Sequence, residues 1–462
     1  MKKVNLTLQD IFEIPTVVIY NPDSYKNITH FSIDSREIKK NTLFIAIKGE
    51  RLDGHNFVDQ AVNNGASALI IDKKYLNRIK DYDITVITVQ DTTKALGEIA
   101  KVWRRKLKAK IIGITGSNGK TTTKEIVSTL LAEKFKVNKT IANNNNHIGV
   151  PLTILSTNEK HNVLVAELGT NHFGEIPYTA PIAFPDYAVI TNIGDSHLEF
   201  LKNRKRVLKE KSALFIETIK NKGKIFINND DPLLKEYGKK IKNKITYGIF
   251  NKADFQCKIL SYDNYARPKI EIKFKKQSFK ITLPISGEKN VSNFLSAFSI
   301  ATELGIGKDK IHKATKKLRS FDKRLEIKNF KKFTLINDTY NANPDSMRSS
   351  LNILSKTGCK KRKIAILGDM FELGKESITK HKELAKFTSN LMIDEVYSIG
   401  SKMKYFDKSL NNRIENHFHF DDRKELRKHL EKMDLSNSVI LVKGSRGMTM
   451  EEFVSVIQAS TD

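Results

Sequence analysis

The most informative segment of the sequence is Lys110-Ile-Ile-Gly-Ile-Thr-Gly-Ser-Asn-Gly-Lys-Thr-Thr-Thr-Lys-Glu125. An apolar run predicts a strand over 111–115, a turn with two glycines follows, and the residues after it favour a helix. Glycines allow backbone N–H groups to close around phosphate oxygens, and the start of a helix adds partial positive charge. The segment therefore predicts a phosphate-binding loop, in which Lys120 reaches the β/γ-phosphates and the Thr121 hydroxyl binds Mg²⁺.

This loop departs from the commonest phosphate-binding pattern. GxxxxGK[ST] would place a glycine at position 114, where the sequence has Ile114. The loop is therefore the shorter variant that begins at Gly116, and the alternative is an unrelated turn that contains Gly-Lys. A strand before the turn and a helix after it favour the phosphate loop. The expected nucleotide contacts are Gly116, Ser117, Asn118, Gly119, Lys120, Thr121 and Thr122.

Short apolar runs alternate with helical patterns along the chain, which is typical of α/β architecture. Most runs are continuously apolar, as in strands that are buried on both faces of a parallel sheet. A helix is expected over Thr92–Leu107. The expected strands are Leu43–Ile47, Ala68–Ile71, Thr85–Val89, Ile111–Thr115, Val163–Leu168, Ala188–Asn192, Lys224–Ile227, Thr334–Asn337, Lys363–Leu367 and Val439–Val442.

Three domains are predicted from this alternation, in agreement with a length of 462 residues. Residues 1–89 form a small α/β domain, residues 90–320 form a central P-loop ATPase domain with a mostly parallel sheet, and residues 321–462 form a further α/β domain. Residues 246–284 differ from the rest of the central domain. Ile270, Ile272 and Phe274 alternate with polar residues there, which indicates antiparallel strands.

The chain is strongly basic, with 80 Lys and Arg against 52 Asp and Glu and a formal net charge of +28. Because the lysines are spread over every segment, we interpret them as a lysine-rich enzyme surface, which would also attract a phosphate-bearing substrate. The alternative is a nucleic-acid footprint. A single Trp and the lack of a motif that clusters aromatic and basic residues argue against it, so we expect no nucleic-acid partner.

Cysteine content and hydropathy predict the compartment. Two cysteines, Cys257 and Cys359, exclude a disulfide scaffold and a thiolate-only metal cage, and they fit a reducing cytoplasm. Asp10 and Glu13 interrupt what would be the apolar core of a signal peptide, and the most apolar helical stretch, Val291–Thr302, is far shorter than a membrane span. We expect a cytoplasmic monomer without a membrane partner.

Two further residues are candidate metal ligands. Glu167 ends an apolar run, and His197 follows the run that begins at Ala188, so both belong at the carboxyl ends of buried strands, where open α/β sheets bind ligands. Taken singly, each residue fits a structural role as a cap or a loop residue. Their shared position beside a phosphate loop favours binding of a divalent cation. The polar cluster Asn143–Asn146 is either a further binding element or a turn.

Over nearly the whole chain, the sequence resembles the Mur ligases, the ATP-dependent amide-forming enzymes of peptidoglycan precursor synthesis. The short loop at 115–122 is similar to the ATP loop of that family, which accounts for the departure at Ile114. The loop is shared with folylpolyglutamate synthases, whereas the motifs of the third domain are more specific. The remaining motifs that carry the resemblance are Asn146–Pro151, Glu167–Ile176, Asp338–Ser346, Leu367–Gly374 and Lys443–Glu452.

The resemblance implies catalytic roles and a metal site. Lys120, Lys211 and His197 would be catalytic, and Thr121, Glu167, His197 and Lys211 would hold metal, with two Mg²⁺ expected. Lys211 falls where family members have a lysine that is modified to a carbamate. That change would turn a cation into an anion able to orient a second Mg²⁺. Lys209, two places earlier, leaves the register open.

The resemblance also implies ligand contacts and a Rossmann-like fold for the third domain. The nucleotide contacts would be Asn290, Arg324, Asp338 and Asn341, although spacing alone makes the last three turn or surface residues. Ser35 and Arg36, in a region that resembles the UDP-binding part of the family, and Asn145 and Asn146 would contact the acceptor substrate.

The activity implied by the resemblance is ATP-dependent joining of D-alanyl-D-alanine to the terminal carboxylate of UDP-N-acetylmuramoyl-tripeptide through an acyl phosphate. The nearest alternative is a sister ligase that adds a different amino acid to a muramyl peptide or glutamate to folate. An NTPase that binds nucleic acid is the alternative from another class. Whether the third residue of the tripeptide is diaminopimelate or lysine stays open.

Overall fold

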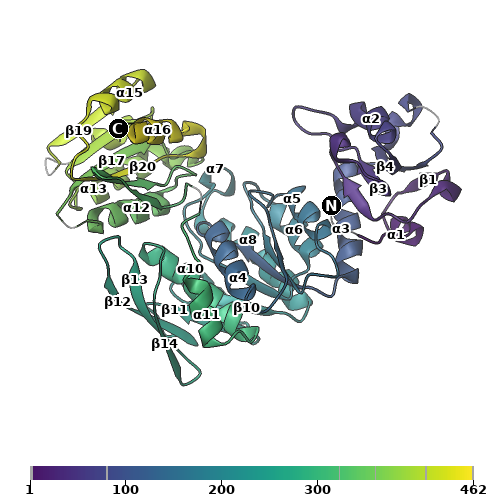
Figure 1. The fold of residues 1–462 in the computed structure, drawn as a ribbon, viewed down its shortest axis with the longest axis horizontal. Coiled ribbons are helices and arrows are strands. Elements are labelled where there is room, and N and C mark those ends of the chain that lie inside the picture. Colours follow the sequence, from purple (N-terminus) through teal and green to yellow (C-terminus); the bar gives the residue numbers. More distant parts are fainter. Residues whose placement is uncertain (1–3, 80–81, 322, 359, 411–413, 460–462) are drawn as a thin grey trace.

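The computed structural model describes residues 4–79, 82–321, 323–358, 360–410 and 414–459. Within these residues the chain forms three α/β parts, each built on its own sheet, of five, nine and six strands. Figure 1 shows the central part between the N-terminal part, in purple, and the C-terminal part, in yellow-green. The α/β class predicted from the sequence is confirmed.

The N-terminal sheet has the order β1-β5-β4-β3-β2 and is parallel except for the β1–β5 pair. It carries the apolar runs near residues 43, 68 and 85 that the sequence indicated. Its elements are α1 (Leu8–Phe12), β1 (Val18–Tyr20), β2 (His30–Ser32), β3 (Thr42–Ile45), α2 (Val58–Asn63), β4 (Ala66–Asp72) and β5 (Thr85–Val89).

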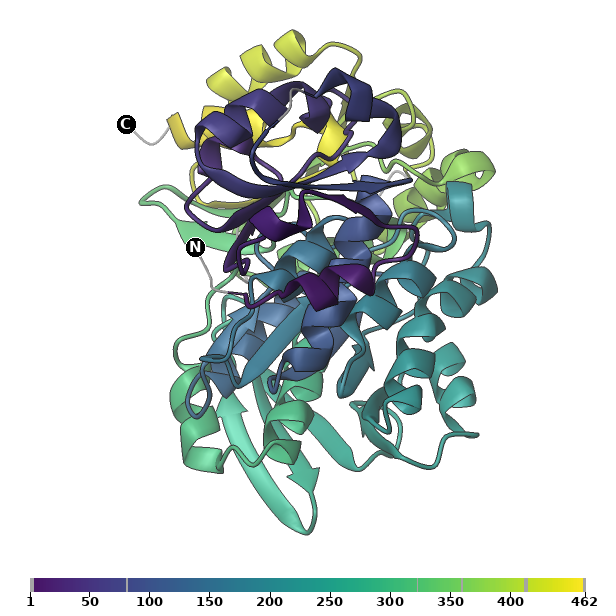
Figure 2. The same ribbon diagram turned by 90° about the vertical axis from the view of Figure 1, so that its right-hand side faces the viewer.

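The central sheet has the order β14-β13-β12-β11-β10-β9-β6-β8-β7. Strands β6 to β11 pair parallel with their neighbours, and so do β11 and β12. The β12–β13 and β13–β14 pairs are antiparallel. The antiparallel excursion predicted over 246–284 is therefore confirmed, and it forms the lower end of the molecule in Figures 1 and 2. The strands are β6 (Lys110–Thr115), β7 (Val137–Lys139), β8 (Val163–Glu167), β9 (Tyr187–Ile190), β10 (Lys224–Asn228), β11 (Lys244–Gly248), β12 (Phe255–Tyr262), β13 (Pro268–Phe274) and β14 (Gln277–Thr282).

Helices cover both faces of the central sheet, and β6 contributes to both cores. Ile111 packs into the core formed with α3, α5, α6 and α8, whereas Ile112 and Ile114 pack with α4, α10 and α11 on the other face. This is why the strand reads as a continuous apolar run. The helices are α3 (Thr92–Lys106), α4 (Lys120–Leu131), α5 (Gly149–Leu155), α6 (Glu175–Ala183), α7 (Leu198–Leu201), α8 (Arg204–Lys220), α9 (Pro232–Gly238), α10 (Glu288–Glu303) and α11 (Lys308–Thr315).

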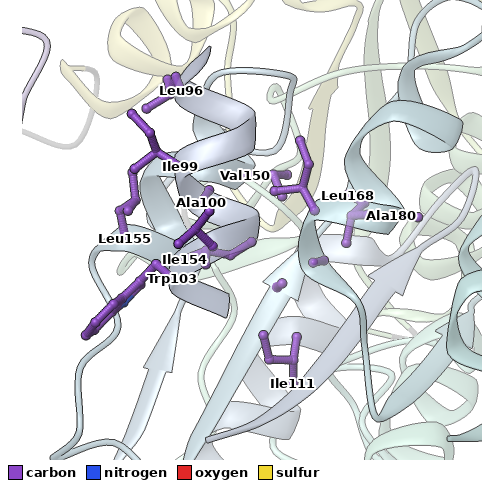
Figure 3. Packing of buried hydrophobic residues seen from close by; sticks show 14 of the residues in the cluster. Leu96, Ile99, Ala100, Trp103, Ile111, Val150, Ile154, Leu155, Leu168 and Ala180 are labelled. Carbon is purple, nitrogen blue, oxygen red and sulfur yellow. The ribbon is translucent and has the colours of Figure 1, made fainter. Parts of the chain in front are cut away.

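Helix α3 joins the N-terminal and central parts through one continuous core. Leu96, Ile99 and Ala100 of α3 are buried in the same cluster as Ile154 of α5, and Figure 3 shows Ile154 beside Ala100. Trp103, also buried, donates its indole N–H to the carbonyl of Thr157 at 2.8 Å. A large aromatic side chain with its polar atom satisfied makes α3 a fixed support for the central sheet.

The C-terminal sheet has the order β15-β16-β20-β17-β18-β19 and is parallel apart from the β15–β16 pair. Asp338 directly follows β16, as expected for a strand exit. The elements are β15 (Glu326–Asn329), β16 (Phe333–Asn337), α12 (Pro344–Lys356), β17 (Arg362–Gly368), α13 (Ser377–Thr388), β18 (Glu395–Ile399), α14 (Met403–Asp407), β19 (Asn416–Phe420), α15 (Arg423–Lys432), β20 (Ser438–Lys443) and α16 (Glu451–Ala459).

One strand end corrects the sequence prediction in a way that matters for the site. The strand expected over 188–192 ends at Ile190. Thr191 and Asn192 leave the sheet because their side chains donate to the carbonyl of Asn118, at 2.5 and 3.0 Å. Within the described residues, no helix combines the length and the apolar character that crossing a membrane requires.

Candidate active site

The phosphate loop lies at the carboxyl end of β6, between the ends of β8 and β9. After β6 the chain continues to β7 on one side of it, and after β8 it continues to β9 on the other side, so this is the switch point where open α/β sheets bind ligands. Gly116 has φ of +151°, and Gly119, the N-cap of α4, has φ of +80°. A Cβ on Gly116 would lie 1.8 Å from Thr191 Oγ1, and one on Gly119 would lie 2.4 Å from Asn293 Oδ1, so both positions need glycine.

Residues after β9 fix the shape of this loop. The amide of Asn118 donates to Asn192 Oδ1 at 3.1 Å, and the amide of Ser117 donates to the carbonyl of Asn192 at 3.0 Å. Ser117 Oγ also accepts from the amide of Gly194 at 2.9 Å and bonds Ser196 Oγ at the same distance. Hydrogen bonds from residues 192–196 therefore fix the conformation of the phosphate loop.

Lys120 is the first residue of α4, and its ammonium folds back to donate to the carbonyl of Gly116 at 2.9 Å. Burial lowers its pKa, and the nearby Glu167 carboxylate opposes that shift. An ammonium that rests on the loop's own carbonyl is placed to exchange that bond for a phosphate oxygen.

Glu167 is the last residue of β8 and is buried. Its Oε1 accepts from Thr121 Oγ1 at 3.1 Å and from Asn145 Nδ2 at 2.9 Å. Among the residues that the structure describes, its buried Oε2 has no hydrogen-bond partner, and Lys124 Nζ lies 3.8 Å from it. A carboxylate that has one oxygen oriented by neutral donors and the other without a hydrogen bond is suited to bind a cation.

His197 is the N-cap of α7 and has the left-handed φ of +53°. Its Nδ1 lies 2.6 Å from Glu372 Oε2, which belongs to the C-terminal part of the chain, but within the described residues the angle between the two groups does not meet hydrogen-bond geometry. This contact lowers the pKa of Glu372. His197 therefore already has a carboxylate partner across the two parts.

Lys211 of α8 is fully buried, and its Nζ has no hydrogen-bond partner among the described residues. Burial, followed by the charge of Lys120, holds its pKa well below the ordinary lysine value, while Glu210 and Glu175 act in the opposite direction. A buried amine with a lowered pKa is neutral more often than an exposed lysine, and a neutral amine is a nucleophile.

The C-terminal part contributes an arginine stacked on a tyrosine. The guanidinium of Arg324 lies 3.6 Å from the centre of the Tyr340 ring. Asp338 is occupied by protein donors, because Lys443 Nζ lies 2.5 Å and Ser350 Oγ 2.6 Å from its Oδ2 and the amide of Leu325 donates to its Oδ1 at 3.0 Å. Asp338 therefore fixes the residue next to Arg324 in this structure.

One cavity of about 590 Å³ collects most of the predicted residues from the central and C-terminal parts. Asn343 Nδ2 donates to Asn118 Oδ1 at 2.7 Å, so the third part touches the phosphate loop directly. The predicted residues that line the cavity are Ser117, Asn118, Gly119, Lys120, Thr121, Thr122, Asn145, Asn146, Glu167, His197, Asn290, Arg324, Asp338 and Asn341.

Four predicted residues do not line this cavity. Gly116, the first residue of the loop, is buried, and so is Lys211 of α8. Ser35 donates its hydroxyl to Gln60 Oε1 at 2.6 Å, and the exposed Arg36 pairs with Asp34 in the N-terminal part. Both residues thus have local partners away from the phosphate loop.

The sequence did not single out the residues that hold the site together. Asn192 belongs to the segment that ends with the candidate ligand His197, and Glu372 and Lys443 belong to motifs that carry the resemblance. Their position in these segments did not assign a role to any of the three. Among the described residues, no three His, Cys, Asp or Glu side chains gather into a metal site of their own. A cation held by Glu167 and Thr121 would need ligand oxygens from elsewhere, such as phosphates.

These features define a class of protein, in which a phosphate-loop nucleotide-binding domain is followed by an α/β domain that completes the site. Three family descriptions match the chain in order: the Mur ligase family, catalytic domain, over residues 27–104; the Mur ligase middle domain, over 114–301; and the Mur ligase, glutamate ligase domain, over 323–446.

Known relatives match over almost the full length. The UDP-N-acetylmuramoyl-tripeptide–D-alanyl-D-alanine ligase of Bacillus subtilis (strain 168) is 35% identical over 462 residues, which cover 98% of each chain. A crystal structure of MurF from Acinetobacter baumannii has a TM-score of 0.89 at 28% identity, covering 99% of this chain and 100% of that one. MurF ligase from Thermotoga maritima, in complex with ADP, has a TM-score of 0.83 at 28% identity, covering 94% and 97%. This chain belongs to the Mur ligase family.

Proposed function

We propose that this chain is an ATP-dependent amide ligase that joins D-alanyl-D-alanine to UDP-N-acetylmuramoyl-tripeptide and releases ADP and phosphate. The observation that carries the proposal is the single cavity in which the phosphate loop, Glu167 and residues of the C-terminal part meet. The relative from Bacillus subtilis, which bears the name of this activity, covers 98% of the chain. Cytoplasmic location and a monomeric state remain predictions.

The chemistry explains why a nucleotide site is needed. A carboxylate oxygen is a poor leaving group, so an amine does not displace it at a useful rate in water. In the proposed reaction, an oxygen of the acceptor carboxylate attacks the γ-phosphorus of ATP, and ADP leaves. The amine of D-alanyl-D-alanine then attacks the acyl carbon and loses a proton, and phosphate departs with the oxygen that came from the carboxylate.

The phosphate loop would supply positioning and charge for the first step. The glycine turn and the amides at the start of α4 would bind the phosphates, and Lys120 would exchange the Gly116 carbonyl for a phosphate oxygen. Two anions must approach each other in this step. Lys120 and Arg324 would offset the repulsion between ATP and the carboxylate.

The residues present fit a magnesium ion next to the phosphates. The unpartnered Oε2 of Glu167 and the Thr121 hydroxyl would be protein ligands, and His197 is a further candidate. Magnesium, when bound, supplies neutralisation of the phosphate charge. Asn145 would keep the Glu167 carboxylate oriented, since it already donates to Oε1.

Lys211 is proposed to be carbamylated and to serve a second magnesium. Carbamate formation requires a neutral amine that attacks CO₂, and the lowered pKa of this buried lysine supports that requirement. The modification would place an anion near Lys120, where the unmodified side chain carries a buried amine.

The remaining contacts belong to the nucleotide and the acceptor. Asn290, Arg324, Asp338 and Asn341 are proposed to reach the nucleotide, with Asp338 acting through the loop that carries Arg324. Ser35, Arg36, Asn145 and Asn146 are proposed to contact the acceptor. We assign UDP binding to residues 1–89, ATP binding to 90–320, and completion of the ligase site to 321–462.

The decisive assay measures phosphate release across a matrix of UDP-muramyl peptides and amine donors. We expect release only when ATP, UDP-N-acetylmuramoyl-tripeptide and D-alanyl-D-alanine are present together, and an amide product in equal amount. Turnover with a single amino acid in place of the dipeptide would assign the chain to a sister ligase. Tripeptides ending in diaminopimelate and in lysine, tested side by side, would settle the third residue.

A further inference from the structure

Glu372 lies in a loop of the C-terminal part yet reaches the central part. It follows β17, and its Oε2 lies 2.6 Å from Nδ1 of His197. His197 and Glu372 both line the cavity that contains the phosphate loop. His197 is a candidate magnesium ligand, whereas Glu372 has no part in the proposed reaction.

A backbone contact joins the same two loops. The amide of Glu199, in α7, donates to the carbonyl of Glu372 at 3.0 Å. Gly374 packs so closely that a Cβ there would lie 3.1 Å from the Glu199 backbone. Glu372 therefore contacts the 197–199 segment through both its side chain and its main chain.

Both partners of the ion pair have an uncommon backbone conformation. His197 has φ of +53° and Glu372 has φ of +62°, in the left-handed region that residues with a Cβ seldom occupy. Such conformations persist where surrounding contacts fix them, and they concentrate at functional sites. Glu372 is fixed from its own side as well, because the amide of Phe371 donates to Ser445 Oγ at 2.8 Å.

We propose that Glu372 is a positioning residue, which orients the His197 ring and selects its tautomer when the C-terminal part is engaged. A proton on Nδ1 makes the contact with the carboxylate favourable and leaves the lone pair on Nε2. Histidines that ligate metals commonly give their other N–H to a carboxylate, and a carboxylate 2.6 Å from Nδ1 is close enough to accept it after a small rotation of the ring. The proposal rests on the function proposed above, and it makes the geometry of a central-domain ligand depend on a residue of the third domain.

The test uses the full-length chain with Glu372→Gln and a matched control, Glu376→Gln. Glu376 lies four residues further on, as the N-cap of α13, and is exposed, and within the described residues its carboxylate forms no ion pair. We expect Glu372→Gln to lower kcat at least tenfold and to leave KM for ATP within threefold of wild type. A merely structural role would not spare KM in this way, and Glu376→Gln should match wild type.

Two further readouts separate positioning from other effects. In a double-mutant cycle, Glu372→Gln combined with His197→Gln should be no slower than His197→Gln alone, within twofold, because the two residues act as a unit. In the nucleotide-free protein, hydrogen exchange of residues 194–201 should be at least fivefold faster in Glu372→Gln and unchanged in Glu376→Gln.

The outcomes distinguish this proposal from the proposed function. Losses that multiply in the double mutant, or hydrogen exchange of 194–201 that equals wild type, would overturn the role of Glu372. If the wild-type chain ligates none of the substrates, the proposed function fails. Hydrogen exchange then decides the proposal alone, since faster exchange in Glu372→Gln supports the positioning contact and unchanged exchange rejects it.

Discussion

Replacing Gly119 by alanine tests whether the glycine turn is a binding element. Gly119 has φ of +80°, and an added Cβ would lie 2.4 Å from Asn293 Oδ1. A residue with a Cβ in left-handed conformation costs about 1–2 kcal/mol. If that cost falls on the bound conformation of the loop, affinity for ATP drops by about 5- to 30-fold, and the clash with Asn293 adds to the loss.

The assay is calorimetric titration of the full-length variant with a non-hydrolysable ATP analogue and Mg²⁺. Two glycines outside the site provide controls. Gly65 has φ of +96°, and an added Cβ would have no neighbouring atom within 4 Å, so Gly65→Ala should lower thermal stability and leave affinity unchanged. Gly307 has φ of −70° and open space, so Gly307→Ala should change neither quantity.

Two results would refute this reasoning. One is a folded Gly119→Ala variant that binds the analogue within twofold of wild type. The other is a Gly65→Ala variant that loses as much affinity as Gly119→Ala, because the effect would then report general strain and not contact with phosphate.

Three further predictions follow from single side chains. Lys120→Ala should abolish ATP-dependent amide formation with unchanged circular dichroism, and near-normal product formation would contradict its assignment. Lys211→Ala should be inactive and regain activity with short carboxylic acids, and wild-type turnover should respond to bicarbonate; indifference to both would remove the carbamate. Burial acts to raise the pKa of Asp53, but hydrogen bonds from Tyr75 and His55 lower it from 3.8 to about 2. The stabilising effect of the Asp53 carboxylate is therefore present above pH 4 and lost as pH falls toward 2. Asp53→Asn should lower the free energy of unfolding by about 1–2 kcal/mol at pH 7 and flatten its dependence on acid pH. A variant with the wild-type free energy of unfolding at pH 7 would show that the carboxylate does not stabilise the fold.

Much of the nucleotide site was predictable because its signals are local in sequence. The order strand, glycine turn and helix around Lys120 is a short-range pattern, and the position of Glu167 at a strand end follows from one apolar run. Each predicted strand began and ended within two residues of the observed strand. The strand expected to reach Asn192 stopped at Ile190 because two side chains bond the phosphate loop, and that partner lies more than seventy positions away.

The parts that sequence reasoning missed depend on long-range pairing. Only the family resemblance assigned Arg324 and Asp338 to the nucleotide site, since their spacing alone indicated turn and surface residues. The structure shows Asp338 engaged by Lys443, which lies far along the chain on β20. Glu372 could not be paired with His197 in advance, because the contact joins two parts of the chain that lie far apart in the sequence. Interdomain geometry has no local periodicity from which it could be read.

The most direct test of the central claim follows one oxygen atom. If UDP-N-acetylmuramoyl-tripeptide is labelled with ¹⁸O in its terminal carboxylate and supplied with ATP and D-alanyl-D-alanine, mass spectrometry of the released phosphate reports where that oxygen goes. Activation through an acyl phosphate predicts one labelled oxygen in each phosphate released. Phosphate without label, alongside an amide product formed in equal amount, would contradict the account.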